Sequence, residues 1–454
     1  MRMRPRLAAL ALAILTLTTA PASAGPVLLI SIDGLRPGDV IEADRRGLRL
    51  PNLRRLASEG AHAGGVVGVL PSVTYPSHAT LLTGASPARS GIVGNTTFDP
   101  LAINQGGWDW YAEDIEVPTL WDGARAQGLS VGNVHWPVSV GANSITWNLP
   151  QIWRTGHADD EKLLRALATP GLLADMQTRL GPYARGIDED IAGDETRGRF
   201  AVDMIRTRKP GLTTVYLTAY DHYQHLYGPG APEAHAVIER IDTVVGRLVE
   251  AARAAIPGVT VAVVSDHGFA PTTTEANLFR PFIDAGLITL DPAGKISGWE
   301  AMPWNSGGSI AVVLARPGDA ALTAKVRALL DDQRRRPGGF VARVIDRAGI
   351  DRMGGNPDAQ FYVDLKPGFL AGNFEGAATP VTRPARYKGM HGYFPDMPAM
   401  RSTFIVAGPG IAAGRDLGEI DMRAIAPTLA RVLGFRLDSA ESPALDIGLA
   451  PAAE

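Results

Sequence analysis

The chain of 454 residues contains no cysteine. This absence excludes disulfide bonds, thiolate metal ligands and a cysteine nucleophile. Any zinc site must therefore use histidine and carboxylate side chains, which are other common ligands of this metal. Stability has to come from a buried core and from any metal that binds. With 45% hydrophobic residues, the chain is rich enough in apolar side chains for a substantial core.

The sequence also lacks a long basic run, and its formal net charge is only −3. Proteins that bind nucleic acid usually concentrate positive charge on one face, so we expect no nucleic-acid-binding surface here. Internal repeats and low-complexity runs are absent from the sequence as well. Charged residues make up 20% of the chain and include both signs, which argues against long disordered regions.

An apolar run long enough for a signal peptide or a membrane anchor occurs only at the N-terminus. Three arginines precede the apolar stretch Leu7 to Ala20, and Ala22-Ser23-Ala24 supplies the small residues of a cleavage site. We therefore predict a signal peptide over residues 1–24 and a periplasmic or secreted mature protein without a stable membrane anchor. An uncleaved N-terminal anchor is the alternative, although this stretch is short for crossing a bilayer.

Short apolar runs alternate with helical patterns along the rest of the chain. The runs are Pro26 to Ile32, Thr213 to Thr218, Val259 to Val264 and Ser402 to Val406. The helical patterns cover Asn52 to Glu59, Ser77 to Leu82, Thr119 to Gln127, Glu195 to Arg208, Ala231 to Ala254 and Asp421 to Leu433. This alternation predicts an α/β fold, with a mostly parallel central sheet and helices on both of its faces.

Two stretches break this alternation. Residues from about 97 to 190 are rich in Trp, Gly and Asp, and we interpret them as inserted loops and helices beside the functional site. Residues 270–385 carry strand and helix patterns of their own, which predict a smaller α+β insertion. The core would then comprise residues 25–269 and 386–441, followed by a loose tail over residues 442–454.

Acidic and histidine side chains follow the predicted strands at the points where they end. Asp33 follows the first strand and Asp266-His267 follows the third, while Asp221 comes after the second with His225 one helical turn later. His391 lies in a glycine-containing loop before the fourth strand. Because ligands gather at the carboxyl ends of parallel strands, we expect these side chains to meet. A set of this size and chemistry suits two zinc ions.

A threonine is the candidate nucleophile. Thr74 precedes a helical pattern, and a threonine in that position is by itself usually a helix cap. The helix that follows would also direct its positive end and its free amides at an anion. A hydroxyl bound to zinc loses its proton far more readily than a free one, which makes Thr74 a usable nucleophile near neutral pH.

These motifs resemble a known family. The segment Thr74-Tyr75-Pro76-Ser77-His78, followed by Leu81-Leu82-Thr83-Gly84, resembles the nucleophile segment of the nucleotide pyrophosphatase/phosphodiesterase family within the alkaline phosphatase superfamily. Asn95 stands where this family places an asparagine that contacts phosphate. The whole set follows the family's order across most of residues 26–410: Asp33, Thr74, Asn95, Asp221, His225, Asp266, His267 and His391.

The resemblance implies an alkaline-phosphatase-like fold and a hydrolase with two zinc ions. One zinc ion would be held by Asp221, His225 and His391, and the other by Asp33, Asp266, His267 and Thr74. Such an enzyme would cleave phosphodiester or phosphoanhydride bonds of small, nucleotide-type substrates through a covalent phospho-threonine intermediate at Thr74. The backbone amide of Tyr75 and the side chain of Asn95 would hold the non-bridging phosphate oxygens.

Several aromatic residues are candidates for the wall of a substrate pocket. Tyr75 either stacks on a nucleobase or forms part of the wall without a role in binding. Trp136, Trp153, Tyr183 and Tyr223 are further candidates. His78, one helical turn after Thr74, is interpreted as a residue packed within the helix, with a hydrogen bond to a ligand residue as the alternative.

The choice between diester and monoester rests on an absent motif. Related monoesterases that use threonine and asparagine carry a Lys-x-Arg pair between the asparagine and the next ligand, and the stretch between Asn95 and Asp221 has none. This absence favours a phosphodiester. A phosphomonoesterase and a phosphonoacetate hydrolase remain the alternatives, and the second would use Lys388 or Arg154 to bind a carboxylate. A sulfatase is disfavoured because its Cys/Ser-x-Pro-x-Arg motif is missing.

A binding protein on the same scaffold, with its chemistry lost, is an alternative of another class. Such a protein would lack the nucleophile or at least one ligand, and all of them are present in this chain. The sequence leaves open the group beyond the scissile bond, the oligomeric state and the metal that occupies each position in the cell.

Overall fold

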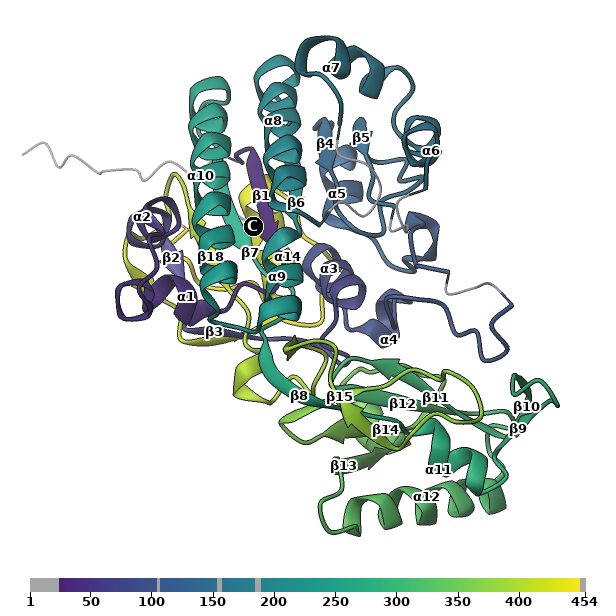
Figure 1. Cartoon of the computed structure of the whole chain (residues 1–454). Coiled ribbons are helices and arrows are strands. Elements are labelled where there is room, and N and C mark those ends of the chain that lie inside the picture. Colours follow the sequence, from purple (N-terminus) through teal and green to yellow (C-terminus); the bar gives the residue numbers. More distant parts are fainter. Residues whose placement is uncertain (1–23, 104–106, 153–156, 184–188, 450–454) are drawn as a thin grey trace, which may run out of the picture.

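A computed structural model describes residues 24–103, 107–152, 157–183 and 189–449. The chain forms a large α/β core with a smaller domain beneath it in the view of Figure 1. The predicted signal peptide lies outside the described residues, apart from Ala24.

Within the described residues, the core is built on an eight-stranded sheet. Its strand order is β19 (Arg415–Asp416), β2 (Ala61–His62), β18 (Phe404–Ala407), β7 (Thr260–Val264), β1 (Val27–Ile32), β6 (Leu212–Leu217), β4 (Val131–Val134) and β5 (Trp147–Leu149). β18 pairs antiparallel with β7 and β2, and the other pairings of this sheet are parallel. The prediction of a mostly parallel central sheet is therefore confirmed.

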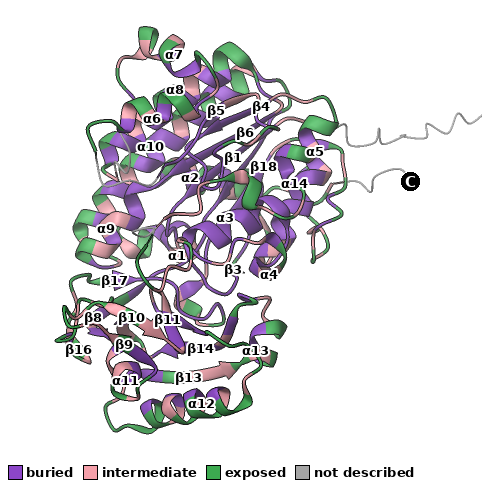
Figure 2. Cartoon of the chain, turned by 90° about the vertical axis from the view of Figure 1, so that its right-hand side faces the viewer, coloured by how far each residue is buried: buried purple, intermediate pink, exposed green. Residues whose placement is uncertain are grey.

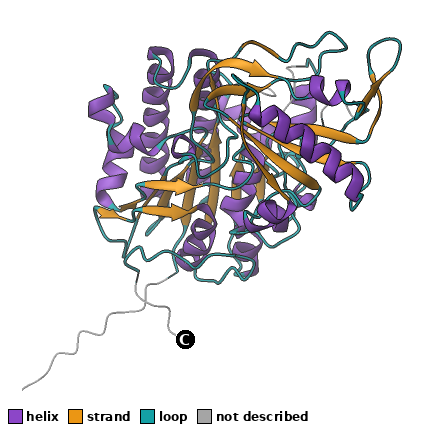
Figure 3. Ribbon diagram, turned by 90° about the horizontal axis from the view of Figure 1, so that it is seen from below, coloured by secondary structure: helices purple, strands orange, loops and turns teal. Residues whose placement is uncertain are grey.

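Helices cover both faces of this sheet, as predicted (Figure 3). One face is covered by α1 (Pro37–Ile41), α2 (Pro51–Glu59), α6 (Asp160–Leu167), α7 (Leu172–Leu180), α8 (Ile191–Arg208), α9 (Ala219–Tyr227) and α10 (Pro232–Ala255). The other face is covered by α3 (Thr74–Thr83), α5 (Leu120–Ala126) and α14 (Ile425–Leu433). Figure 2 shows the buried strands between helices whose outer sides are exposed. Strands β1, β6 and β7 are buried at every residue, which explains their continuous apolar character.

The smaller domain has its own sheet and hydrophobic core. Its antiparallel sheet has the order β11 (Ala301–Ser306), β12 (Ser309–Leu314), β14 (Ala359–Leu365) and β13 (Val341–Asp346). Around it lie α11 (Phe279–Asp284), α12 (Ala320–Arg335), α13 (Arg347–Arg352) and the hairpin of β9 (Ile288–Leu290) and β10 (Ile296–Trp299). We call this domain, residues 270–385, the insertion.

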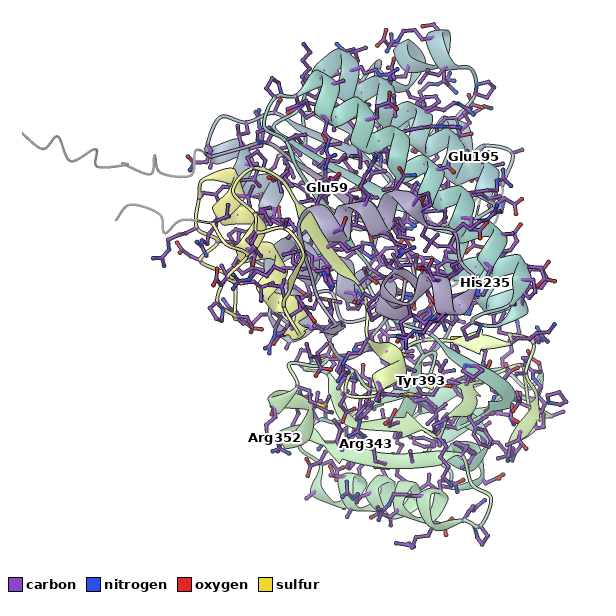
Figure 4. The ribbon with its side chains drawn as sticks, turned by 90° about the vertical axis from the view of Figure 1, so that its left-hand side faces the viewer. Glu59, Glu195, His235, Arg343, Arg352 and Tyr393 are labelled. Atoms are coloured by element: carbon purple, nitrogen blue, oxygen red, sulfur yellow. The ribbon has the colours of Figure 1, made fainter. Side chains whose placement is uncertain are left out.

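A second small sheet joins the insertion to the core. Strand β8 (Ala270–Ala276) pairs with β15 (Gly368–Ala371), β16 (Thr382–Pro384) and β17 (Gly389–Met390). Tyr393 lies at this junction (Figure 4). Its carbonyl accepts a hydrogen bond from Ser72 Oγ of the core at 2.5 Å, and its hydroxyl donates to the carbonyl of Phe369 in the insertion. These contacts tie the two domains together beside the carboxyl ends of the central strands.

The remaining elements are short. They are β3 (Gly65–Val67), which pairs with β20 (Glu419–Asp421), α4 (Pro87–Ser90), and the 3₁₀ helices η1 (Ala43–Arg46), η2 (Ala112–Asp114), η3 (Pro398–Met400) and η4 (Met422–Ala424).

The interpretation of residues 97–190 as inserted loops and helices is wrong in one respect, because this stretch contributes β4 and β5 to the central sheet. Both strands are short, and β4 reads Val-Gly-Asn-Val. Two buried asparagines, Asn133 and Asn148, join these strands through a 2.8 Å side-chain hydrogen bond. The stretch therefore lacks the continuous apolar run that marks the other central strands.

The predicted loose tail is also wrong for residues 442–449, which pack on the core. Ile447 is fully buried, and its carbonyl accepts a hydrogen bond from the amide of Ala412 at 3.1 Å. The amide of Leu445 donates to Thr428 Oγ1 at 2.8 Å. Alternate residues of this segment are apolar, and they cover the α14 side of the sheet. Residues 450–454 lie outside the described part of the chain.

Candidate active site

The predicted acidic ligands gather at the carboxyl ends of three adjacent central strands. Asp33 follows β1, Asp221 lies in the first turn of α9 after β6, and Asp266 follows β7. Because β6, β1 and β7 are neighbours in one parallel register, their ends bring these carboxylates together. All three side chains are buried.

Asp221 stands between two histidines. His225 lies one turn further along α9, and its Nε2 is 3.2 Å from Asp221 Oδ2. His391 approaches from the other side, with its Nε2 3.7 Å from Asp221 Oδ1. The second ring nitrogen of each histidine contacts a backbone carbonyl, that of Gly389 for His225 at 2.9 Å and that of Ser72 for His391 at 3.3 Å. These contacts leave each Nε2 directed at the site.

The second group is centred on His267. Its Nε2 lies 3.3 Å from Asp33 Oδ1 and 3.1 Å from Asp266 Oδ2. Its ring stacks on that of His391, with ring centroids 3.6 Å apart and planes inclined by 8°. His267 therefore belongs to two compact groups, one with Asp33 and Asp266 and one with Asp221 and His391, and the ligand atoms within each group lie within 4.8 Å of one another.

Burial and mutual repulsion set the electrostatics of these carboxylates. Burial raises the pKa of Asp266 to about 7, and the charge of Asp221 adds to this shift. Burial likewise raises the pKa of Asp33 well above its usual value, and Asp266 and Asp221 add to this effect. Burial opposes ionisation of Asp221 too, but the charge and hydrogen bond of His225 lower its pKa below the usual range. Three acidic groups are thus confined where full ionisation needs positive charge.

The histidines show the complementary pattern. Burial lowers the pKa of His391 to about 4, and burial together with the charge of His391 lowers the pKa of His267 well below its usual value. Burial also disfavours the charged form of His225, yet the attraction of Asp221 raises its pKa. Neutral imidazoles at His267 and His391 are the form that binds a metal ion.

The ligand atoms themselves indicate that a metal fits here. Among the described residues, Asp33 Oδ1, Asp221 Oδ1, Asp266 Oδ2 and His267 Nε2 are buried and make no hydrogen bond. Such groups are costly when buried without a partner. Carboxylate and imidazole donors that converge without hydrogen-bond partners are what zinc accepts. The residues present therefore fit a bound metal.

Thr74 opens α3 beside this cluster and is itself buried. The residue before it, Val73, has extended backbone and no capping side chain, so Thr74 is the first helical residue rather than the cap. The amide of Tyr75 donates a 2.9 Å hydrogen bond to Asn95 Oδ1. This bond holds the loop that carries Asn95 at the helix N-terminus, and it leaves the Asn95 amino group as the donor that faces a ligand.

Sequence reasoning missed three supporting residues. The Tyr216 hydroxyl, from β6, donates to Asp33 Oδ2. Asp194, from α8, accepts hydrogen bonds from the amides of Thr218 and Ala219 at 3.0 and 2.9 Å, and so caps the helix that carries Asp221 and His225. Arg197 pairs with this buried carboxylate at 2.7 Å. Tyr216 and Asp194 contact residues that are distant in sequence, at Asp33 and at the start of α9, so no local motif marks their roles.

His78 combines features of both predicted roles, because it is packed within the helix and also contacts Thr74, a predicted ligand residue. It is fully buried between Ser31 Oγ and the carbonyl of Thr74, each 2.8 Å from a ring nitrogen, and burial lowers its pKa to about 3. Its Nδ1 also lies 3.7 Å from Asp266 Oδ2.

A cleft of about 790 Å³ opens over these groups between the core and the insertion. Its core side includes Thr74, Asn95 and Trp108, whose ring centroid lies 5.4 Å from that of Tyr75. Tyr75 also belongs to the lining of the cleft, but it is fully buried and presents no exposed ring surface. The insertion side includes Arg383, and the segment that follows it supplies Arg386 and Tyr387, none of which the sequence analysis identified.

Most of the other aromatic candidates do not line the cleft. Trp136 and Tyr183 are buried in the hydrophobic core, and Tyr223 packs against the face covered by α10. Of the two cationic candidates, Lys388 does not line the cleft. Arg154 and the aromatic candidate Trp153 lie outside the described residues.

Comparison with known proteins identifies the family. The fold first places the chain among α/β proteins with a site at the carboxyl ends of a parallel sheet. The sequence model of the family described as type I phosphodiesterase / nucleotide pyrophosphatase matches residues 27–366. The chain belongs to this family, which confirms the resemblance found in its sequence. The family is metal-dependent, in agreement with the two groups of candidate ligands.

Curated relatives match over about half of the chain. An uncharacterized pyrophosphatase/phosphodiesterase of Schizosaccharomyces pombe is 29% identical over 251 residues, which are 54% of this chain and 45% of the relative. Ectonucleotide pyrophosphatase/phosphodiesterase family member 3 of Bos taurus is 24% identical over 256 residues, 54% of this chain and 25% of the relative. The chain thus spans less than half the length of these relatives.

Solved structures with the same fold match over nearly the whole chain. Murine ectonucleotide pyrophosphatase/phosphodiesterase 5 superimposes with a TM-score of 0.63 at 18% identity, covering 93% of this chain and 97% of the murine one. An inactive form of the murine protein in complex with AMP gives a TM-score of 0.64 at 17% identity, with the same coverage. In the described part of the chain, no helix combines the length and apolar character needed to cross a membrane.

Proposed function

We propose that the chain is a two-zinc hydrolase that cleaves phosphodiester or phosphoanhydride bonds of nucleotide-type substrates, with Thr74 as the nucleophile. The proposal is carried by the convergence of buried carboxylate and imidazole atoms that make no hydrogen bond, beside a buried threonine at a helix N-terminus. Membership of the family supports the reaction class.

We assign the ligands as the sequence predicts. Asp221, His225 and His391 would hold one zinc ion, and Asp33, Asp266, His267 and Thr74 the other. The position of His267 between both groups supports a pair of neighbouring sites. When bound, two zinc ions lower the pKa of a coordinated hydroxyl and stabilise charge on the attacking and leaving oxygens of an in-line displacement.

The residues of the chain then act in sequence. Thr74 Oγ attacks phosphorus, and the bond from phosphorus to the departing oxygen breaks, which leaves a phospho-threonine. Water then attacks the same phosphorus, releases a phosphate monoester and returns the Thr74 hydroxyl. The Asn95 amino group is oriented by the Tyr75 amide and would donate to a non-bridging oxygen. The Tyr75 amide, predicted as a second donor, contacts Asn95 here, so its role toward phosphate stays a prediction.

Two features favour a diester. The stretch between Asn95 and Asp221 has no Lys-x-Arg pair to neutralise a terminal phosphate. The arginines that line the cleft, Arg383 and Arg386, come from the insertion and from the segment directly after it. Nucleotide-type substrates are supported by the related murine protein, whose inactive form was solved with AMP. A phosphonoacetate hydrolase is the second candidate, with Arg386 rather than Lys388 as the group available to a carboxylate.

We also propose that the mature protein is exported, either to the periplasm or outside the cell. The signal-peptide pattern of residues 1–24 supports this location. The relatives named ectonucleotide enzymes and venom phosphodiesterases agree with it.

The decisive experiment compares kcat/KM for bis-p-nitrophenyl phosphate and p-nitrophenyl phosphate with purified, zinc-loaded mature protein. We expect a strong preference for the diester. A preference for the monoester would show that another cation serves the terminal phosphate, and the phosphodiesterase assignment would be wrong. Hydrolysis of neither compound, with turnover of phosphonoacetate, would favour the second candidate.

A further inference from the structure

The segment that directly follows the insertion supplies the cleft with an aromatic ring and a guanidinium group on consecutive residues. Arg386 and Tyr387 lie between β16 and β17, and both line the cleft. The Tyr387 ring centroid is 5.1 Å from that of His225. The backbone around Tyr387 is fixed at two points: its carbonyl accepts from Thr272 Oγ1 at 2.8 Å, and the amide of Lys388 donates to the carbonyl of His225 at 2.8 Å.

Tyr387 is accessible to a ligand. It is 43% exposed, and Leu226, which lines the same part of the cleft, is 37% exposed. By contrast, the Tyr75 ring on the core side is fully buried. Exposed apolar side chains that border a cleft beside a chemical centre mark a surface for part of a ligand.

Arg386 is the cation of this wall with the weakest internal partner. The Glu375 carboxylate makes its shorter hydrogen bonds to Arg383, at 2.5 and 2.8 Å, and reaches Arg386 at 3.3 Å. Arg383 is held further by two bonds to Glu275, at 2.9 and 2.5 Å. The Arg386 side chain is 73% exposed. The two arginines and the two glutamates of this group have no net charge. Because its hydrogen bond to Glu375 is the longest in the group, Arg386 is the arginine that can turn toward an anion.

The direction of the reaction places the departing group on this wall. In an in-line displacement the leaving oxygen departs opposite the nucleophile. Under the proposed function, on which this inference rests, Thr74 is the nucleophile and the ligand group of Asp221 and His225 faces the leaving oxygen. Tyr387 packs against His225, so a group attached to that oxygen extends over Tyr387 and Arg386.

We propose that Arg386 and Tyr387 form a subsite for the leaving group, and that this subsite recognises a nucleotide. The Tyr387 ring would stack on the base, and the Arg386 guanidinium would bind a phosphate of the same group. The preferred substrate would then carry a nucleotide on each side of the bond that breaks.

The test uses two substrates that share the AMP arm and differ in the leaving group. Diadenosine diphosphate releases AMP, whereas the methyl ester of AMP releases methanol. The measured quantity is the ratio of kcat/KM for the first substrate to that for the second, with zinc-loaded protein. Taking the ratio cancels any effect of a variant that is common to both substrates. We expect Arg386→Ala and Tyr387→Ala each to lower this ratio by about tenfold.

Matched controls are available on the surface. Arg316 is an exposed arginine of the insertion, paired with Glu300 and Asp319, and Tyr111 is 46% exposed; neither lines the cleft. Arg316→Ala and Tyr111→Ala should leave the ratio unchanged. Calorimetry with a methylene-bridged, uncleavable analogue of diadenosine diphosphate gives a direct readout, and we expect the two cleft variants to bind it about tenfold more weakly than wild type.

The outcomes separate the two proposals. An unchanged ratio and unchanged analogue binding in both cleft variants would overturn the leaving-group subsite, even with an active wild-type enzyme. A decrease for Arg386→Ala alone would overturn the stacking of a base on Tyr387. If wild type hydrolyses neither diadenosine diphosphate nor the methyl ester of AMP, the proposed function fails instead.

Discussion

The two sides of the cleft differ in how their charged groups are buried and paired. The core side places buried carboxylates and imidazoles at the ends of β1, β6 and β7, with ligand atoms left without hydrogen-bond partners among the described residues. The other side presents a chain of arginine and glutamate pairs that runs from the buried Glu275 through Arg383 and Glu375 to the exposed Arg386. Buried, unpaired charge is tolerated only where a ligand or metal compensates it, so the core side is suited to chemistry and the insertion side to recognition.

One contact between the core and the insertion lies directly behind the site. The amide of Gly308, in the turn between β11 and β12, donates to the carbonyl of His391 at 2.8 Å. Gly392 follows with φ of +84°, and a Cβ there would lie 1.9 Å from the carbonyl oxygen of Ser306. The insertion therefore helps to place a predicted metal ligand as well as to line the cleft.

Removal of the nucleophile should have the largest effect. We expect Thr74→Ala to lower kcat by more than about a thousandfold, roughly 4 kcal/mol of barrier, because the alanine side chain has no hydroxyl to attack phosphorus. Zinc content and the melting temperature serve as controls and should stay near wild type. Activity within about tenfold of wild type would refute the role of Thr74.

Chelation tests the core side as a whole. Removal of metal leaves several buried ligand atoms without partners, so we expect loss of activity and a lower melting temperature. Zinc at about a thousand times its dissociation constant would restore about 4 kcal/mol of stability. The measurement is a thermal melt with and without added zinc, on protein whose metal content is known. Full activity in demonstrably metal-free protein would exclude the two-zinc assignment.

Gly392→Ala should disturb the contact between the two sides. The added Cβ clashes with the Ser306 carbonyl and strains the left-handed backbone, so we expect His391 to shift and zinc affinity to fall by about tenfold to a hundredfold. Gly414→Ala is the matched control, because Gly414 has φ of +65° and a Cβ at this residue would meet nothing within 4 Å. Equal zinc affinities for the two variants would show that the clash with the Ser306 carbonyl does not disturb His391.

The smallest expected effect concerns pH and a carboxyl group behind the core side. Burial, with a contribution from Asp114, raises the pKa of Asp109 to about 7. Because the folded-state pKa is raised, the protonated group stabilises the fold below about pH 4, and this contribution is lost as the pH rises through 7. We expect Asp109→Asn to reduce the loss of stability between pH 4 and 8 by on the order of 2 kcal/mol.

Denaturant unfolding across this pH range, with the exposed Asp438→Asn as control, measures the Asp109 effect. Parallel pH profiles for Asp109→Asn and wild type would contradict it.

The elements that sequence reasoning identified are those with a local signal. Continuous apolar runs marked β1, β6, β7 and β18, and the residues at their ends marked the candidate site. The short strands β4 and β5 were not predicted, because buried asparagines replace apolar side chains there. The same reasoning identified Thr74 and Asn95 from a motif, while the burial of Tyr75 against Trp108 depends on neighbours that are distant in sequence.

The sequence by itself determined the α/β class, the family and the set of candidate ligands, because these depend on local patterns of apolar, acidic and histidine residues. Only the tertiary structure decided that His267 belongs to both groups of candidate ligands, that Asp194 caps α9, and that the segment after the insertion brings Arg386 and Tyr387 to the cleft. These relations join segments that are far apart along the chain, and packing of the folded domains, rather than any local preference, brings them within contact distance.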